Sequence, residues 1–168
     1  LAAMSDQYYT IAEAESTTSG RIPPHNNEAE QSVLGSILLK DRSFTSVLDI
    51  LSPSDFYRRP HQIIFEAMID IFQKNEPQDL VTITNRLNDQ NSLTDVGGPT
   101  YLASLTSIVP VTANITAYAR IIRQKSILRN LISVNSDIAN RCFEEQGDID
   151  QLVDDAEQAI FDIAGKKS

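Results

Sequence analysis

Residues 112–143 read TANITAYARIIRQKSILRNLISVNSDIANRCF, and this stretch contains neither proline nor glycine. Its apolar residues recur mostly at steps of three and four, the spacing of one face of an α-helix. They are Ile115, Tyr118, Ile122, Leu128, Leu131, Val134 and Ile138. Thr112 follows Pro110-Val111, and we expect its hydroxyl to cap the first turn. The stretch predicts one amphipathic helix, long beside the globular average of about 11–12 residues.

A helix of that length cannot bury its apolar stripe alone, and the residues that follow supply a partner. Residues 150–164 (DQLVDDAEQAIFDIA) repeat the helical spacing. Asp148 or Asp150 is expected to cap this second helix. Only residues 144–147 (EEQG) separate the two stretches, and so short a connection makes neighbouring helices antiparallel. The C-terminal third therefore predicts a helical hairpin.

The composition indicates an ordinary folded domain. With 168 residues and 41% apolar content, the chain is long enough to bury one core, as a single domain or as a head with an appendage. Its single cysteine, Cys142, excludes an internal disulfide and fits a reducing, cytoplasmic environment. No apolar run approaches the roughly 20 residues of a membrane span, and no secretory signal is recognised. We therefore expect no membrane partner.

The formal net charge of −9 works against direct binding of nucleic acid, which depends on basic patches. A partner of the whole surface is expected to be basic or apolar. Arg120, Arg123, Lys125 and Arg129 are the only concentration of basic residues, and they lie along the long helix. We interpret them as a solvated face rather than as a binding stripe.

The first 21 residues are expected to contribute nothing to the fold. Residues 1–3 (LAA) precede Met4 and look like the remnant of an expression tag. Residues 5–20 are rich in Ser, Thr and Glu without a sustained period. We predict a tag remnant and a disordered tail over residues 1–21.

Between the tail and the hairpin, five short helices are expected, and Glu28 and Glu30 fall in the first turn of the first, where acidic charge is favourable. Residues 81–84 (VTIT) would suit a strand by propensity, but no second strand exists nearby to pair with them. The predicted fold is all-α, a compact multi-helix head (22–108) followed by a long antiparallel hairpin (112–165). The head helices are expected to start at Asn26 or Asn27, to span residues 43–51, to start at Arg59-Pro60, and to span residues 79–87 and 101–105.

The residues by themselves indicate no catalytic, cofactor or metal site. A phosphate-binding loop ends in Gly-Lys-Ser or Gly-Lys-Thr, whereas residues 97–99 (GGP) indicate a tight turn before a helix. His25, His61 and Cys142 lack the spacing of metal ligands. His61, at a helix start, is expected to be packed or hydrogen-bonded there. The acidic pairs near the hairpin turn are expected to be solvated.

A set of short motifs, in a fixed order, resembles the N-terminal domain of DnaB-type replicative DNA helicases of bacteria. The likeness extends from about Ile22 to Ala164, and the ordered set is specific although each piece alone is weak. The motifs are residues 21–35 (RIPPHNNEAEQSVLG), Asp55-Phe56-Tyr57 with His61 and Ile64, residues 79–82 (DLVT), residues 97–102 (GGPTYL), and Asn114 with residues 118–121 (YARI).

In that family this region is a helical head plus a hairpin, and a RecA-like motor domain follows after a linker. The resemblance implies a collar in which hairpins pair and the domains close as a trimer of dimers above the motor ring, where the C-terminal domain of primase docks. The Walker A, Walker B and arginine-finger motifs of the motor are absent from these 168 residues. ATP and Mg²⁺ are therefore expected for the full-length helicase and not for this stretch.

The resemblance also implies which residues meet partners. Ile132 and Ile138 suit the hairpin core or a contact between subunits as well as a primase contact, whereas aromatic and arginine side chains dominate binding hot spots. The positions that match primase contacts of the family are Tyr101, Arg129, Ile132 and Ile138. The predicted self-association residues are Leu128, Leu131, Leu152 and Ile160.

Two functions therefore compete. The first is a helicase collar that self-assembles and docks primase. The alternative is a free-standing helical adaptor or regulatory interaction domain unrelated to helicase activity. A phosphate-binding loop encoded downstream would decide between them.

Overall fold

The computed structural model describes residues 20–110, 113–145 and 147–165. Within these residues the chain forms seven α-helices and no β-strand, which confirms the predicted all-α fold. The predicted tail lies outside them except for Gly20 and Arg21. The helices are α2 (Asn27–Leu39), α3 (Phe44–Leu48), α4 (Arg59–Gln73), α5 (Leu80–Asp89), α6 (Gly98–Ile108), α7 (Ile115–Glu144) and α8 (Ile149–Gly165), with two short 3₁₀ helices, η1 (Asp41–Ser43) and η2 (Pro53–Asp55).

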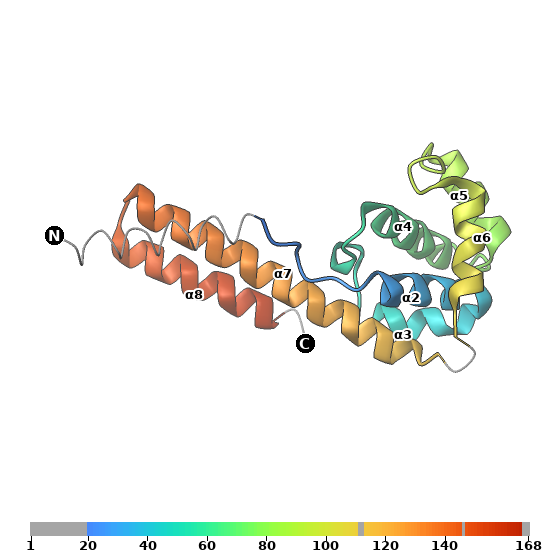
Figure 1. The fold of residues 1–168 in the computed structure, drawn as a ribbon, viewed down its shortest axis with the longest axis horizontal. Helices are drawn as coiled ribbons and strands as arrows, with labels where there is room; N and C mark the ends of the chain where they lie inside the picture. The colour runs from blue at the N-terminus through green and yellow to red at the C-terminus, as the bar shows by residue number, and fades with distance from the viewer. Residues whose placement is uncertain (1–19, 111–112, 146, 166–168) are drawn as a thin grey trace.

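Helix α2 is the central element of the head. Its N-cap is Asn26, whose side chain accepts a hydrogen bond from the backbone N–H of Ala29. Between Ala29 and Leu38 every residue except Gln31 is buried. The reason is that α4, α6 and α7 all pack against this helix, and Figure 1 shows α2 enclosed at the compact end of the molecule. Helix α2 is therefore the element around which the core of the head packs.

At Gly35, α6 approaches α2 too closely to leave room for a side chain. A Cβ atom at this position would overlap the carbonyl oxygen of Leu105 and would lie 2.7 Å from Cγ2 of Val109. Glycine is therefore required here for close helix packing and not for an unusual backbone angle.

The predicted starts of α4 at Arg59-Pro60 and of α5 after Asp79 are confirmed, whereas α3 is shorter than the predicted 43–51 and α6, which begins at Gly98, is longer than the predicted 101–105. Asp79 caps α5 by accepting the Thr82 backbone N–H at 2.8 Å. The β-branched run after it is helical because Ile83 and Leu87, one turn apart, are both buried on one side. Gly97, with φ of 104°, makes the left-handed turn before α6.

The long helix α7 belongs to both parts of the molecule. Its first half packs against the head, and its second half extends beyond the head beside α8 (Figure 1). The predicted start near Thr112, a residue outside the described part of the chain, is wrong. Helix α7 begins at Ile115, and Asn114 caps it by accepting the Ala117 backbone N–H at 3.2 Å. Asn114 takes the extended backbone that an N-cap needs, and asparagine caps at least as well as threonine.

The predicted hairpin is confirmed. Helix α7 ends at Glu144, and Glu145 turns the chain with a left-handed backbone, φ 49°. Of the two predicted caps for α8, Asp148 is the observed one, since its Oδ1 accepts the backbone N–H of Asp150 at 3.0 Å. No residue of α8 is fully buried, so the hairpin has no core of its own beyond the line where the helices meet.

Candidate functional site

The hairpin carries an exposed apolar face. At about 100° per residue, its members on each helix fall within one sector. On each helix, this sector is turned in the same sense away from the side that contacts the other helix. Because the two helices are antiparallel, both sectors then lie on the same face of the hairpin. We call it the hairpin face. Its members are Leu128 (45% exposed), Ile132 (45%) and Phe143 (63%) on α7, and Ile149 (77%), Val153 (51%) and Ile160 (45%) on α8.

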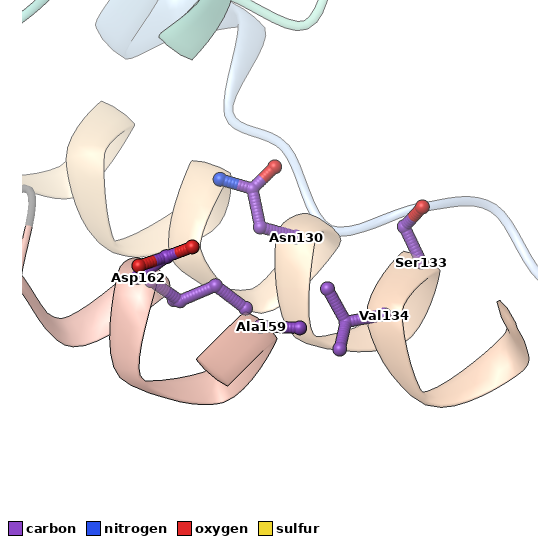
Figure 2. Close-up of a pocket in the computed structure, with 6 residues that line it drawn as sticks. Asn130, Ser133, Val134, Ala159 and Asp162 are labelled. Atoms are coloured by element: carbon purple, nitrogen blue, oxygen red, sulfur yellow. The ribbon is translucent and has the colours of Figure 1, made fainter. Parts of the chain in front are cut away.

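The opposite side of the hairpin holds an open groove of about 310 Å³ between α7 and α8 (Figure 2). Its polar groups are one amide, one hydroxyl and one carboxylate, from Asn130, Ser133 and Asp162. Val134, Ala159 and Ile163 complete the lining. This set contains no nucleophile paired with a base, so the groove does not have the composition of an active site.

A buried carboxylate joins the head to α7. Asp55, at the end of η2, is 3% exposed. Its Oδ1 accepts hydrogen bonds from Arg123 Nη1 at 2.8 Å and from Ser126 Oγ at 2.7 Å. Its Oδ2 accepts the backbone N–H of Ser52 at 2.8 Å. With both oxygens satisfied and a cation beside it, the carboxylate tolerates burial and fixes α7 against the head.

Arg129, six residues after Arg123 on α7, lies over the same junction. Its Nη1 donates to the carbonyl oxygen of Pro24 at 2.7 Å and its Nη2 to that of Asp55 at 2.6 Å. The guanidinium carbon lies 5.5 Å from the centre of the Tyr57 ring. Burial lowers the pKa of Arg129, and the nearby charges of Glu30 and Asp55 offset part of that effect. The side chain therefore connects three segments of the chain.

A second polar cluster lies inside the head. His61 is fully buried, with Nδ1 at 2.7 Å from Glu30 Oε1 and Nε2 at 2.6 Å from the hydroxyl of Tyr101. Glu30 is 1% exposed, and its Oε2 accepts the backbone N–H of Tyr57 at 2.9 Å. The expected role of His61, hydrogen-bonded at a helix start, matches this geometry.

The profile of the DnaB-like helicase N-terminal domain family matches residues 22–124. The chain belongs to this family. It is 42% identical over 149 residues to the replicative DNA helicase DnaB of Geobacillus stearothermophilus, covering 89% of this chain and 33% of that protein. It is also 42% identical over 148 residues to the replicative DNA helicase DnaC of Bacillus subtilis, covering 88% and 33%. The chain thus spans about a third of the length of these relatives.

Solved structures agree with this membership. The crystal structure of the N-terminal domain of DnaB helicase from Mycobacterium tuberculosis matches with a TM-score of 0.80 and 38% identity, covering 84% of this chain and 99% of that one. The N-terminal domain of DnaB helicase from Helicobacter pylori, described with its interactions with primase, matches with a TM-score of 0.61 and 26% identity, covering 69% and 90%. A DnaB-like replicative helicase, also described with its interactions with primase, has a TM-score of 0.68 and 25% identity, covering 82% and 31%.

In this DnaB-like domain the four predicted partner-binding residues do not form one continuous surface. Ile132 belongs to the hairpin face, and Ile138 is half-buried beside it. Arg129 points into the junction, and Tyr101 is half-buried on α6 with its hydroxyl held by His61. The structure thus separates two positions on the free part of the hairpin from two positions whose side chains are held at the head.

The four predicted self-association residues all lie on the hairpin, two on α7 and two on α8. Leu128 and Ile160 are members of the hairpin face. Leu131 and Leu152 are half-buried where α7 meets α8, adjoining that face. A seam between copies of the DnaB-like domain would therefore combine both kinds of position.

The predicted solvated basic face of α7 is wrong for two of its four residues. Arg120 is exposed, but Arg123 and Arg129 turn inward to Asp55 and the carbonyl groups around it. Arg123, Ser126 and Arg129 follow each other at steps of three, so they share the side of α7 that meets the head. The signal in the sequence was this spacing of one serine between two arginines, and the structure shows that the serine is buried.

Glu30 and Asp55 are the residues that sequence reasoning missed. Glu30 was assigned only to the helix dipole, although the residues around it in α2 are buried.

In the described part of the DnaB-like domain, no group of three or more His, Cys, Asp or Glu side chains lies close enough to hold a metal ion. None of the described helices is both long and apolar enough to cross a membrane.

Proposed function

We propose that this chain is the N-terminal collar domain of a hexameric replicative DNA helicase, which assembles through its hairpin and docks the C-terminal domain of primase. In this proposal residues 22–108 are the head, residues 112–165 are the hairpin, and residues 1–21 take no part. Copies pair as dimers through the hairpins, and three dimers close the collar.

The hairpin face is the observation that carries the proposal. It exposes six large apolar side chains on two helices that have little core between them. Exposed large apolar side chains gathered on one side of a folded domain mark an interaction site, and burying them contributes about 25 cal/mol per Å² of apolar area. Because both helices contribute to one face, a second copy can cover it with the same face in a two-fold arrangement.

The docking of primase is proposed from relatives whose descriptions name that interaction. The whole protein would then bind ATP and Mg²⁺ through a motor domain outside these residues and would act in the cytoplasm. Ile132 is the position best placed for a partner, because it is exposed on the hairpin face next to half-buried apolar neighbours.

The test of assembly is the mass of the protein in solution. Leu128→Asp places a charge on the hairpin face, where burial without a partner is strongly unfavourable, so we expect the parent to form an oligomer that this variant does not form. Ser133→Asp adds the same charge at an exposed α7 position in the groove on the opposite side of the hairpin and should leave the mass unchanged. Light scattering over a wide concentration range measures both. A parent chain that is monomeric throughout contradicts the proposal.

The test of docking is calorimetry with the cognate primase C-terminal domain. Ile132→Ala should weaken binding by about 1 kcal/mol or more if Ile132 is a docking hot spot. Ser133→Ala is the control from an exposed position on the opposite side of the hairpin. Should Ile132→Ala change the oligomeric mass and leave primase affinity at the parent value, Ile132 is a contact between subunits and not a docking residue.

A further inference from the structure

A continuous chain of contacts joins Tyr101 on α6 to Arg129 on α7. The Tyr101 hydroxyl lies 2.6 Å from His61 Nε2, and His61 Nδ1 lies 2.7 Å from Glu30 Oε1. The other Glu30 oxygen accepts the Tyr57 backbone N–H at 2.9 Å. The Tyr57 ring then lies under the Arg129 guanidinium, 5.5 Å from its centre to Cζ. Two positions on different helices are thus linked by three intervening residues.

With Glu30 ionised and His61 neutral, one direction of hydrogen bonding satisfies every atom of this chain of contacts. An ionised carboxylate only accepts, so in the neutral imidazole of His61 the hydrogen is on Nδ1 and Nε2 is an acceptor. The Tyr101 hydroxyl must then donate to Nε2, while its oxygen accepts from Gln31 Nε2 at 3.3 Å. Loss of the hydroxyl would leave Nε2 of a fully buried imidazole without a partner.

The other end of this chain of contacts, at Tyr57 and Arg129, is also fixed by several contacts. Tyr57 has its backbone N–H on Glu30 and its ring stacked on His25, with centroids 4.3 Å apart. Arg129 covers the same ring and donates to the carbonyl oxygen of Pro24, the residue before His25. A shift of Glu30 therefore moves Tyr57, and a shift of Tyr57 moves the surface on which Arg129 lies.

A gain in folding stability does not by itself explain this buried chain of contacts. Burial of a carboxylate and an imidazole is costly, and even a fully satisfied pair is often no better than apolar residues of similar volume. What a fully bonded buried network does provide is one defined geometry, because its members lose bonds together.

We propose that Glu30, His61 and Tyr57 are positioning residues that couple the side chains of Tyr101 and Arg129. The two residues are then set as one unit, although they are on different helices. The coupling is a property of the free domain. Its use in primase docking rests on the proposed function.

The first experiment is nuclear magnetic resonance of the isolated protein. Tyr101→Phe removes only the hydroxyl, and we expect shifts in the Arg129 Nε–Hε signal and in the Tyr57 amide signal. Hydrogen exchange of the Tyr57 amide should become about tenfold faster as its bond to Glu30 opens more often. The control is Gln78→Leu, which removes another buried hydrogen bond of the head, from Gln78 Nε2 to the carbonyl oxygen of Met68 at 2.6 Å.

The control separates coupling from a general loss of stability. Gln78→Leu changes a buried contact elsewhere in the head and touches none of the residues that link Tyr101 to Arg129, so it should leave the Arg129 and Tyr57 signals in place. Unchanged Arg129 and Tyr57 signals in Tyr101→Phe, with only the His61 ring signals altered, would overturn the proposal. Tyr101→Phe is nearly isosteric, and His61→Gln serves as a second variant that breaks the middle of the chain.

The second experiment is a double-mutant cycle on primase affinity with Tyr101→Phe and Arg129→Lys. If the two residues are coupled, the loss of primase affinity in the double variant should be smaller than the product of the losses in the two single variants, by about threefold or more. Independent losses that multiply, together with unchanged resonance signals, would refute the coupling. If the signals shift as expected but neither variant changes primase affinity, the coupling stands and the proposed docking function fails at these two residues.

Discussion

Arg129 is a residue whose sequence position suggests a partner contact and whose surroundings give it a structural task as well. Its two hydrogen bonds go to carbonyl oxygens in separate segments, at Pro24 and Asp55. We expect Arg129→Ala to lower the free energy of unfolding by about 1–3 kcal/mol, because buried carbonyl groups lose their donors. Arg129→Lys should restore little of the lost stability, since one ammonium group cannot reproduce the two N–H donors that the guanidinium directs to separate carbonyl oxygens.

Urea denaturation measures this effect, and Arg120→Ala is the matched control. Arg120 is exposed on the same helix, so its truncation should stay within about 0.5 kcal/mol of the parent. Equal stability of the Arg129 and Arg120 variants would mean that the two carbonyl contacts contribute nothing to folding. Any binding measurement on Arg129 variants has to be compared with this stability series.

Gly35 makes a second prediction at the same scale. Alanine is the better helix former by about 1 kcal/mol, which by itself would stabilise α2. Here the added methyl group would meet the Leu105 carbonyl oxygen and Val109, so overpacking of about 1–3 kcal/mol outweighs that gain. We expect Gly35→Ala to unfold at lower urea concentration than the parent. An increase in the midpoint would show that α6 can move away from α2 at little cost.

At the scale of elements, α4 and α5 are joined by charge. Arg86 on α5 pairs with Asp70 on α4 and, at 3.0 Å, with Glu76 between the helices. The hydrogen bond from Arg86 is the largest influence that holds the pKa of Asp70 below its ordinary value of 3.8. A carboxyl whose pKa is lowered by folding gives stability that is complete above the unfolded pKa and is lost as the pH falls through the folded pKa.

The sign of this linkage gives a pH prediction. Asp70→Asn should be less stable than the parent at neutral pH, and the difference in unfolding free energy should shrink once the pH falls below 3.8, the ordinary pKa of the group. Urea titrations at several pH values between neutrality and acid measure it. Asp89→Asn, at an exposed position on α5, is the control. A difference that grew toward acid would contradict the assignment of Asp70 to this ion pair.

For the whole molecule, the hairpin face predicts that folding and assembly are linked. Any partner that binds only the folded state raises the apparent melting temperature with its concentration, and a second copy of the chain is such a partner. The melting temperature of the parent should therefore rise with protein concentration, whereas that of Leu128→Asp should not. Calorimetric scans across a hundredfold range of concentration test this. A constant melting temperature for the parent would mean that the hairpin face is not buried between copies.

By itself the sequence determined the elements. The spacing of apolar residues along 112–143 and 150–164 and the short connection between them were enough for the hairpin. Capping residues such as Asn26 and Asp79 were enough for helix starts in the head. These signals are local, because a helix is stabilised by residues a few positions apart. Where two short side chains competed to cap α7, local reasoning chose Thr112 and the chain uses Asn114.

Only the tertiary structure decided what the polar residues do. Glu30 and His61 are 31 positions apart, and Asp55 and Arg129 are 74 apart, so no periodicity relates them. Their pairing follows from the packing of α2, α4 and α7, which removes water and leaves each charge dependent on a partner from another element. For the same reason the sequence does not distinguish Arg120 from Arg129. In the fold Arg120 is exposed to solvent, whereas Arg129 is hydrogen-bonded to the head.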